Sequence, residues 1–228
     1  SIVCGHLSAY GRTGPRATWP GYDYLMQAEA GYLSVTGEPE GPPARFGLSI
    51  VDLMTGVTAV MGLLAGIIDA RANGKGRDID VSLFDVALTN LNYVAAWYLN
   101  DGVQVKREPR SAHPSLTPSQ LYRTQDGWLF VMCNKEKFWP LLTKAIGKPE
   151  WATHPDYANY KARLTNREQL TRELDAVLGT ATTVQWLERL SGIVPVAPVY
   201  DVAQALDSPF VREQGCIMEA PHPARGMI

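Results

Sequence analysis

The sequence lacks the features that define several common classes of protein. Its 21 basic and 23 acidic residues almost cancel, and the net charge of −2 gives no overall signal for nucleic acid or an anionic membrane. The apolar run that follows Asp52 spans about 16 residues, which is short for a membrane span, and Thr and Gly interrupt it. We therefore expect a protein that binds neither nucleic acid nor a membrane.

Cysteine and histidine are also scarce. The three cysteines are odd in number and far apart, and the four histidines are scattered without a zinc-binding pattern. These spacings predict no metal site and favour buried thiols in a reducing compartment, the cytoplasm. The cysteines are Cys4, Cys133 and Cys216.

Two familiar catalytic signatures are absent as well. The segment around Ser49 lacks the second glycine of a Gly-x-Ser-x-Gly elbow. The segment Gly74-Lys75-Gly76 is not a phosphate-binding loop, because no glycine lies five residues before it and no Ser or Thr follows the lysine. A carboxylate is what remains for covalent chemistry.

What is present is typical of a globular protein with one or two domains: 46% of residues are hydrophobic and 19% are charged. Residues 1–85 mix strands and helices, and a second section reads as α+β. The pattern predicts strands at 1–7 and 77–83, helices at 24–30, 53–72 and 84–99, and a helix end at Asn73-Gly74. Further on it predicts a hairpin of 116–123 with 128–133, helices at 135–146, 166–179 and 184–191, N-caps at Thr165 and Thr183, and a short helix capped by Asp201.

Asp52 is a lone carboxylate in one of the most apolar stretches of the chain. Burying a charge costs free energy unless the charge is paired or used. One interpretation is that Asp52 is the N-cap of the following helix, accepting hydrogen bonds from backbone N–H groups. The other is that it is a catalytic nucleophile, and local pattern alone leaves both open.

Several segments in order along the chain carry a resemblance to a known family. They are Gly11-Arg12-Thr13-Gly14-Pro15, Gly21-Tyr22-Asp23 with Gln27 and Gly31, Thr36-Gly37 with Gly41-Pro42-Pro43, Asp52 with Thr55-Gly56, Asn73 through Asp85, His113-Pro114-Ser115, Tyr122 through Gly127, and Val194 through Val199. With these segments the chain resembles the class III CoA-transferases, which include the formyl-CoA, carnitine-CoA and succinyl-CoA:dicarboxylate transferases and the 2-methylacyl-CoA racemases.

The resemblance implies the chemistry of the site. It makes Asp52 the nucleophile that attacks an acyl-CoA, giving an aspartyl mixed anhydride and then an enzyme–CoA thioester that a carboxylic, possibly dicarboxylic, acid accepts. Coenzyme A is then a substrate and no cofactor is implied. We expect an apolar wall of Ile50, Val51, Leu53 and Met54 to exclude water, because water would hydrolyse the anhydride.

The resemblance also supplies the neighbours of Asp52. It implies that Pro20, Gly21, Tyr22 and Asp23 face CoA or the reacting carbonyl, with Gln27 beside them, and it adds Leu83 and His113 to the substrate-binding residues. From the residues alone, Tyr22 and Asp23 read equally as a half-buried tyrosine and a turn residue, and His113 as a linker histidine. Racemases of this family carry histidine where Tyr22 stands, and a phenol is a poor base at neutral pH, so Tyr22 favours transferase over racemase.

The implied architecture is an α/β fold: a partial Rossmann-like large domain plus a smaller α+β domain, in an interlocked homodimer. The corresponding domains are 1–99, which holds the CoA-binding part and Asp52, a linker at 100–115, the small domain at 116–200, and a return linker at 201–228. Family members are longer, and the chain starts on an apolar strand, so we expect an internal piece of an enzyme that is inactive alone. A non-catalytic remnant that keeps only folding and association surfaces is the alternative.

Overall fold

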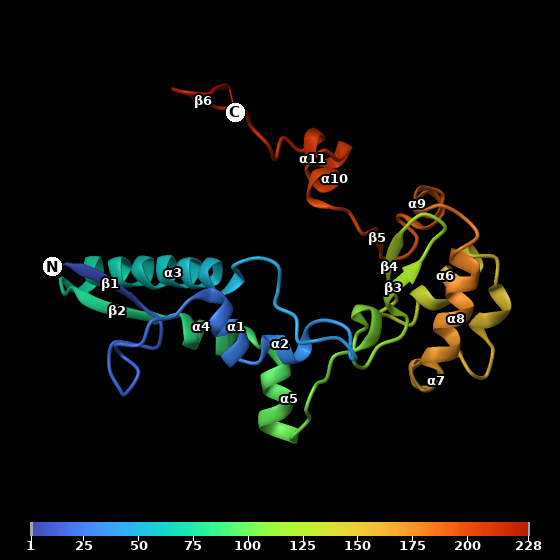
Figure 1. Cartoon of the computed structure of the whole chain (residues 1–228), viewed down its shortest axis with the longest axis horizontal. Helices are drawn as coiled ribbons and strands as arrows, with labels where there is room; N and C mark the ends of the chain where they lie inside the picture. The colour runs from blue at the N-terminus through green and yellow to red at the C-terminus, as the bar shows by residue number, and fades with distance from the viewer. Residues whose placement is uncertain (1, 228) are drawn as a thin grey trace. The chain divides into compact units, whose positions relative to one another are not determined.

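The computed structural model describes residues 2–227, and the chain divides into two compact units, Ser1–Pro114 (unit 1) and Ser115–Ile228 (unit 2). Figure 1 labels their helices and strands. The division lies within the linker predicted at 100–115. Each unit is described by itself.

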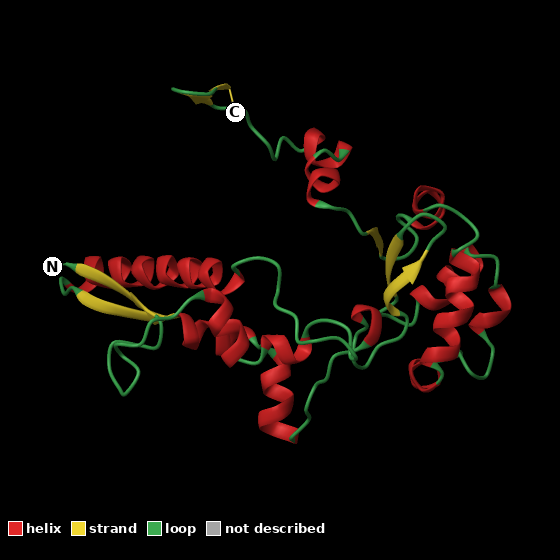
Figure 2. Ribbon diagram, in the orientation of Figure 1, coloured by secondary structure: helices red, strands yellow, loops and turns green. Residues whose placement is uncertain are grey.

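Unit 1 is built on two parallel strands joined by a long helix. Strand β1 (Val3–Ser8) pairs with β2 (Arg77–Ser82) in a register that runs from Val3–Arg77 to Ser8–Ser82. Parallel strands need a crossover connection, and α3 (Ile50–Asn73) provides it by packing along both strands (Figure 2). At Gly66 a Cβ atom would lie 2.9 Å from Val3 Cγ1, so only glycine allows this close approach. Both predicted strands and the helix end, where Gly74 is left-handed, are confirmed.

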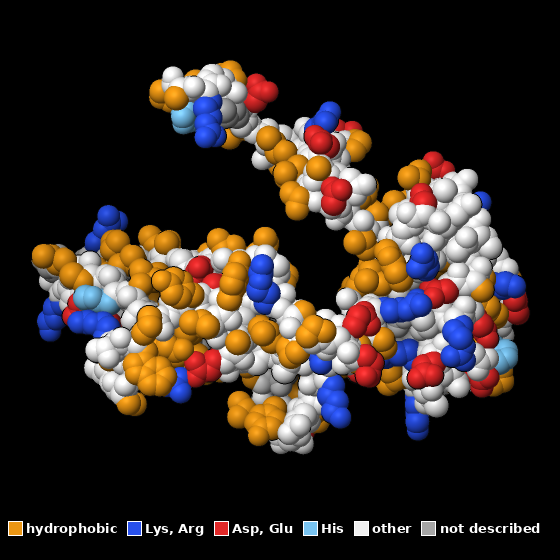
Figure 3. Space-filling model, in the orientation of Figure 1, with side chains coloured by type: hydrophobic (Ala, Val, Ile, Leu, Met, Phe, Trp, Pro, Cys, Tyr) orange, Lys and Arg blue, Asp and Glu red, His pale blue; other side chains and the backbone are white. Residues whose placement is uncertain are grey.

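Helix α3 buries one face and exposes another. Its buried residues, Val51, Thr55, Ala59 and Gly66, recur at helical spacing. Hydrophobic side chains on its other side gather at the surface of unit 1 (Figure 3); they include Leu53, Val57, Val60, Met61, Leu64 and Ile68. By length and composition alone α3 could cross a membrane, but its contacts with β1 and β2 are those of a helix within a folded domain.

The remaining helical segments of unit 1 lie before and after α3 in the sequence. They are α1 (Asp23–Glu29), α2 (Tyr32–Val35), α4 (Leu83–Asn90), α5 (Tyr93–Asp101) and the 3-10 turn η1 (Pro109–Ser111). Met26, Ala30, Val51 and Ala87 form a small buried cluster. The single helix predicted at 84–99 is wrong: the chain breaks at Asn92, whose φ of 52° does not continue a helix.

Unit 2 holds an antiparallel sheet with the strand order β3-β4-β5. The strands are β3 (Ser119–Arg123), β4 (Trp128–Met132) and β5 (Val196–Pro198). The predicted hairpin is confirmed, and the Thr124 N–H donates to the Gly127 carbonyl at 3.0 Å to close its turn.

Helices cover this sheet around a closed core. They are α6 (Phe138–Ala145), η2 (Pro149–Ala152), α7 (Tyr160–Thr165), α8 (Arg167–Leu178) and α9 (Thr183–Leu190). The core includes Trp139, Leu142, Leu170, Leu174 and Trp186. The buried Arg163 donates to the carbonyls of Thr117 and Tyr157 and pairs with Glu136, which satisfies its charge inside the unit.

The helix caps of unit 2 correct two sequence predictions and confirm one. Thr165 is not the N-cap of α8, and no capping box forms there, because that helix starts after Asn166. The cap of α9 is Thr182 rather than Thr183, in a capping box with Gln185. Asp201 does cap its short helix, through Gln204.

The segment predicted as a return linker contains short regular elements. They are α10 (Val202–Leu206), α11 (Pro209–Glu213), β6 (Pro221–His222) and β7 (Gly226–Met227). Most of their side chains are exposed.

Candidate active site

Asp52 lies inside the first turn of α3, at the third helical position. The helix begins at Ile50, and its N-cap is Ser49, whose side chain makes no capping hydrogen bond. The interpretation of Asp52 as an N-cap is therefore wrong. Among the described residues, no donor contacts the Asp52 carboxylate, which remains available for chemistry.

The cap of α3 comes from a different helix. Oδ2 of Asp23, the first residue of α1, accepts hydrogen bonds from the N–H groups of Val51 at 2.6 Å and Asp52 at 3.1 Å. Only 3% of Asp23 is exposed. Because the first N–H groups of a helix lack partners within the helix and carry partial positive charge, a buried carboxylate is stabilised there. The main chain of Asp52 is thus held by a side chain 29 residues away in sequence.

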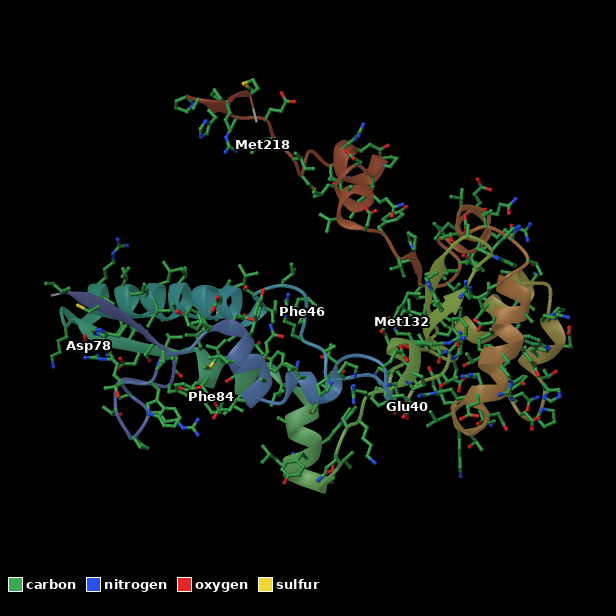
Figure 4. All side chains as sticks on the ribbon, viewed as in Figure 1. Glu40, Phe46, Asp78, Phe84, Met132 and Met218 are labelled. Carbon is green, nitrogen blue, oxygen red and sulfur yellow. The ribbon has the colours of Figure 1, made fainter. Side chains whose placement is uncertain are left out.

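Gln27 completes this network one helical turn after Asp23. Its Nε2 donates to Asp23 Oδ1 at 2.5 Å and to the Leu48 carbonyl at 3.2 Å. Its Oε1 accepts the Phe46 N–H at 2.9 Å. Phe46, labelled in Figure 4, lies on the loop that leads into α3. The amino group and the carbonyl oxygen of the buried amide both have hydrogen-bond partners. Gln27 therefore fixes both this loop and the carboxylate of Asp23.

Two effects raise the pKa of the Asp52 carboxyl above its usual value. Partial desolvation contributes most, and the negative charge of nearby Asp23 adds to it. A more basic carboxylate is a better nucleophile while it is ionised. The two carboxylates therefore have separate tasks: Asp23 holds backbone N–H groups, whereas Asp52 carries the raised pKa.

Asp52 opens onto a shallow groove of about 570 Å³ along α3. Its lining is Ser49, Asp52, Leu53, Gly56, Val57, Val60 and Met61. The apolar wall predicted for Asp52 is wrong in three of its four members, because Val51 is buried beneath α1 and neither Ile50 nor Met54 lines the groove. The four-residue spacing from Asp52 to Gly56 and Val60 along one helical face could have identified the groove from the sequence.

The other predicted substrate-binding residues have different positions. Pro20 and Tyr22 are exposed just before α1, with 74% of Tyr22 accessible, and Gly21 approaches Ala9 too closely to accept a side chain. Leu83 packs against the small core of unit 1. His113 is half-buried after η1, at the end of unit 1. The structure thus brings together Asp23, Gln27 and Asp52, and the contacts of every predicted site residue with substrate stay predictions.

A larger apolar cavity in unit 1, of about 970 Å³, does not include Asp52. Its lining comes from α2 and the two residues before it, from Pro39, from α4, from α5 and from the segment after α5, with Lys106 and Arg107 as its cationic side chains. We place the candidate site at the smaller groove because Asp52, the residue predicted to be the nucleophile, lines it. In the described part of the chain, no three His, Cys, Asp or Glu side chains gather as metal ligands do.

Comparison with known proteins identifies the family of the chain. The profile of CoA-transferase family III matches residues 1–228. The chain is 32% identical over its full length to human succinyl-CoA:glutarate CoA-transferase, of which it covers 52%. It is 34% identical over 96% of its length to acetyl-CoA:oxalate CoA-transferase of Acetobacter aceti, of which it covers 57%. The chain therefore spans about half the length of the curated relatives it matches.

Solved structures share the fold. A CaiB/BaiF family protein from Brucella suis superposes with a TM-score of 0.82 at 29% identity, and the match covers all of this chain and 63% of that one. Rv3272 from Mycobacterium tuberculosis gives a TM-score of 0.87 at 26% identity over all of this chain and 60% of its own. The mixed α/β fold expected from the sequence is confirmed at this level.

Proposed function

Because the chain belongs to CoA-transferase family III, we propose that it contributes the nucleophile of an enzyme that moves CoA from an acyl-CoA donor to a carboxylic acid acceptor. The observation that supports this is that two different carboxylates serve the start of α3, one as its cap and one left for chemistry. Asp23 caps the helix, which leaves the Asp52 carboxylate unpaired, with a raised pKa, beside an apolar groove.

The proposed reaction begins at Asp52. One of its oxygens attacks the thioester carbonyl carbon, the C–S bond breaks, and the thiolate leaves with the electron pair. The product is a mixed anhydride between Asp52 and the acyl group. The thiolate then attacks the Asp52 carbonyl, which releases the donor acid and leaves an Asp52–CoA thioester.

The acceptor repeats these steps in reverse order. Its carboxylate attacks the Asp52–CoA thioester and expels the thiolate, and the thiolate attacks the acceptor carbonyl of the new anhydride. The product acyl-CoA leaves and Asp52 is again a carboxylate. Every bond that breaks is replaced by an equivalent bond, and no oxidant or cofactor is needed.

We propose dicarboxylic acids as the acceptor class. The relatives named above are a succinyl-CoA:glutarate and an acetyl-CoA:oxalate CoA-transferase. A third, from Haloarcula hispanica, is a succinyl-CoA:mesaconate CoA-transferase with 30% identity. A homodimer and a cytoplasmic location are part of the same proposal.

Trapping the intermediate in the complete gene product tests the proposal. Incubation with an acyl-CoA followed by hydroxylamine should convert Asp52 to the hydroxamate, and borohydride should reduce the thioester at the same residue to homoserine; peptide mass spectrometry reads both. We expect Asp52→Asn to lower kcat on the order of a thousandfold or more, because a nucleophile has no substitute in this sequence of steps.

Asp85 is the matched control. It occupies the same third position in the first turn of α4, where its N–H is capped by Ser82. Asp85→Asn should retain turnover. Normal activity of Asp52→Asn, or a trapped adduct at another residue, would refute the proposal.

A further inference from the structure

A cationic side chain outside the groove contacts the loop that precedes Asp52 in the sequence. Arg107 follows α5, and its Nη1 donates to three main-chain carbonyls: Glu38 at 2.9 Å, Gly41 at 2.6 Å and Pro42 at 3.0 Å. Three residues later the Arg110 N–H donates to Glu38 Oε1 at 2.8 Å. The segment after α5 is thereby tied to the loop before α3.

The loop has few N–H groups of its own that could donate hydrogen bonds to these carbonyls. Pro39, Pro42 and Pro43 have no N–H group, and the loop closes on itself through the Gly41 N–H to Glu38 at 3.1 Å and the Ala44 N–H to Thr36 at 3.4 Å. A guanidinium that donates to converging carbonyl oxygens makes charge-assisted hydrogen bonds, which are stronger than neutral ones. Arg107 is half-buried, so water competes less for these bonds than at a fully exposed side chain.

The held loop runs directly into the site. Two residues after Ala44, the Phe46 N–H reaches Gln27, and the Leu48 carbonyl reaches Gln27 as well. Gln27 contacts Asp23, and Asp23 holds the N–H of Asp52. Arg107 and Gln27 therefore fix the chain at two successive places before the nucleophile.

We propose that Arg107 is a positioning residue for Asp52: its guanidinium holds residues 37–44 in the conformation that delivers Asp52 to the thioester. The inference rests on the proposed function, since it assigns Arg107 to the same nucleophile. Arg107 touches no reacting atom in this scheme and acts through the loop and the start of α3. A displacement of the nucleophile by about 1 Å lowers the rate on the order of a hundredfold, so a loosened loop has a measurable consequence.

The test is Arg107→Met in the complete gene product, since Met removes the donors and keeps much of the apolar length. We expect kcat to fall on the order of tenfold to a hundredfold, with the KM for acyl-CoA changed less than about threefold, because the loss is one of alignment rather than binding. Arg107→Lys should recover part of kcat, because an ammonium also donates to carbonyl oxygens. Lys106→Met, which removes the neighbouring cation, is the control and should retain the native kcat.

Two further measurements separate positioning from general stability. Hydrogen exchange of residues 37–44 should accelerate in Arg107→Met while exchange in unit 2 is unchanged. In Arg107→Ala, added guanidinium at low millimolar concentration should restore part of kcat, which a variant damaged only in folding would not show. If Arg107→Met folds poorly, Arg107→Lys and the guanidinium experiment still decide the matter.

The outcomes also separate this inference from the proposed function. Native kcat in Arg107→Met, with Asp52→Asn inactive, would overturn the role of Arg107 and leave the proposed function intact. Failure to trap any adduct on Asp52 would remove the proposed function, and the positioning role with it, even if loop exchange accelerates. Unchanged exchange of the loop in Arg107→Met would overturn the inference whatever the activity.

Discussion

Unit 2 encloses fifteen buried apolar residues in one cluster, whereas the cluster between α1, α3 and α4 in unit 1 has four. In unit 1 the apolar residues of α3 are instead largely at the surface (Figure 3). Unit 2 therefore has a core of its own, and unit 1 relies on the parallel βαβ contacts and on polar networks. The candidate active site lies in the unit with the smaller core.

The difference is chemically useful. The proposed nucleophile would have to meet a large substrate, which needs an open helix face, and a closed core cannot provide one. The main chain of Asp52 is accordingly fixed by the hydrogen bond that its N–H donates to Asp23, which in turn accepts one from Gln27, rather than by close packing around the carboxylate. Measurements that compare the two units can confirm or break this view.

Matched truncations should give the largest difference in stability. Leu174 on α8 is 1% exposed and Val57 on α3 is 54% exposed. We expect Leu174→Ala to lower the free energy of unfolding of unit 2 by about 2–5 kcal/mol, the cost of a cavity in a packed core. Val57→Ala should cost less than about 0.5 kcal/mol in this chain.

Chemical denaturation monitored by tryptophan fluorescence and circular dichroism measures both values. A cost at Val57 equal to that at Leu174 would break the comparison, since it would mean that the α3 face is covered in solution. Val184→Ala, at an exposed position of unit 2, controls for the loss of helical valine.

The second prediction concerns the cap of α3. Asp23→Ala should destabilise unit 1 by about 1–2 kcal/mol, because two helix N–H groups lose their acceptor. Ser49→Ala should cost close to nothing, although Ser49 is the N-cap by position and N-cap serines usually contribute. Thermal unfolding of the two variants gives the comparison, and a larger loss for Ser49→Ala would contradict the cap by Asp23.

The smallest expected effect is a shift in pH dependence. Asp23→Asn keeps an acceptor for the α3 N–H groups and removes the charge that helps to raise the pKa of Asp52. Since attack needs ionised Asp52, a lower pKa moves the acid limb of the kcat/KM profile to lower pH. An acid limb that stays in place, or moves to higher pH, would show that Asp23 does not act on Asp52 through its charge.

Local patterns in the sequence predicted much of this fold. The β1, α3 and β2 series, the left-handed Gly74 and the β3–β4 hairpin all depend on neighbours in sequence. The break between α4 and α5 was missed because the apolar stripe, which Asn92 interrupts, resumes at Ala95, and only the backbone angle of Asn92 shows that the helix itself stops there.

The site was harder to predict because its decisive contacts are distant in sequence. A carboxylate at the start of a helix reads as a cap when the true cap, Asp23, comes from another helix. The resemblance named Asp23 and Gln27 with Asp52, and the structure places the three close together, but nothing local showed that Asp23 accepts the N–H of Asp52 and that Gln27 holds Asp23. Arg107 gave no sequence signal, since its partners are carbonyl groups that every residue possesses.

Because the cap of α3 is supplied by a neighbouring helix, the temperature at which activity is lost depends on the contact between α1 and α3. If α1 separates from α3, the start of α3 loses its acceptor and Asp52 loses its orientation, although the βαβ core and unit 2 remain folded. Such partial openings require less free energy than global unfolding. Loss of activity on heating should therefore track the separation of two short helix ends and precede the melting of the protein as a whole.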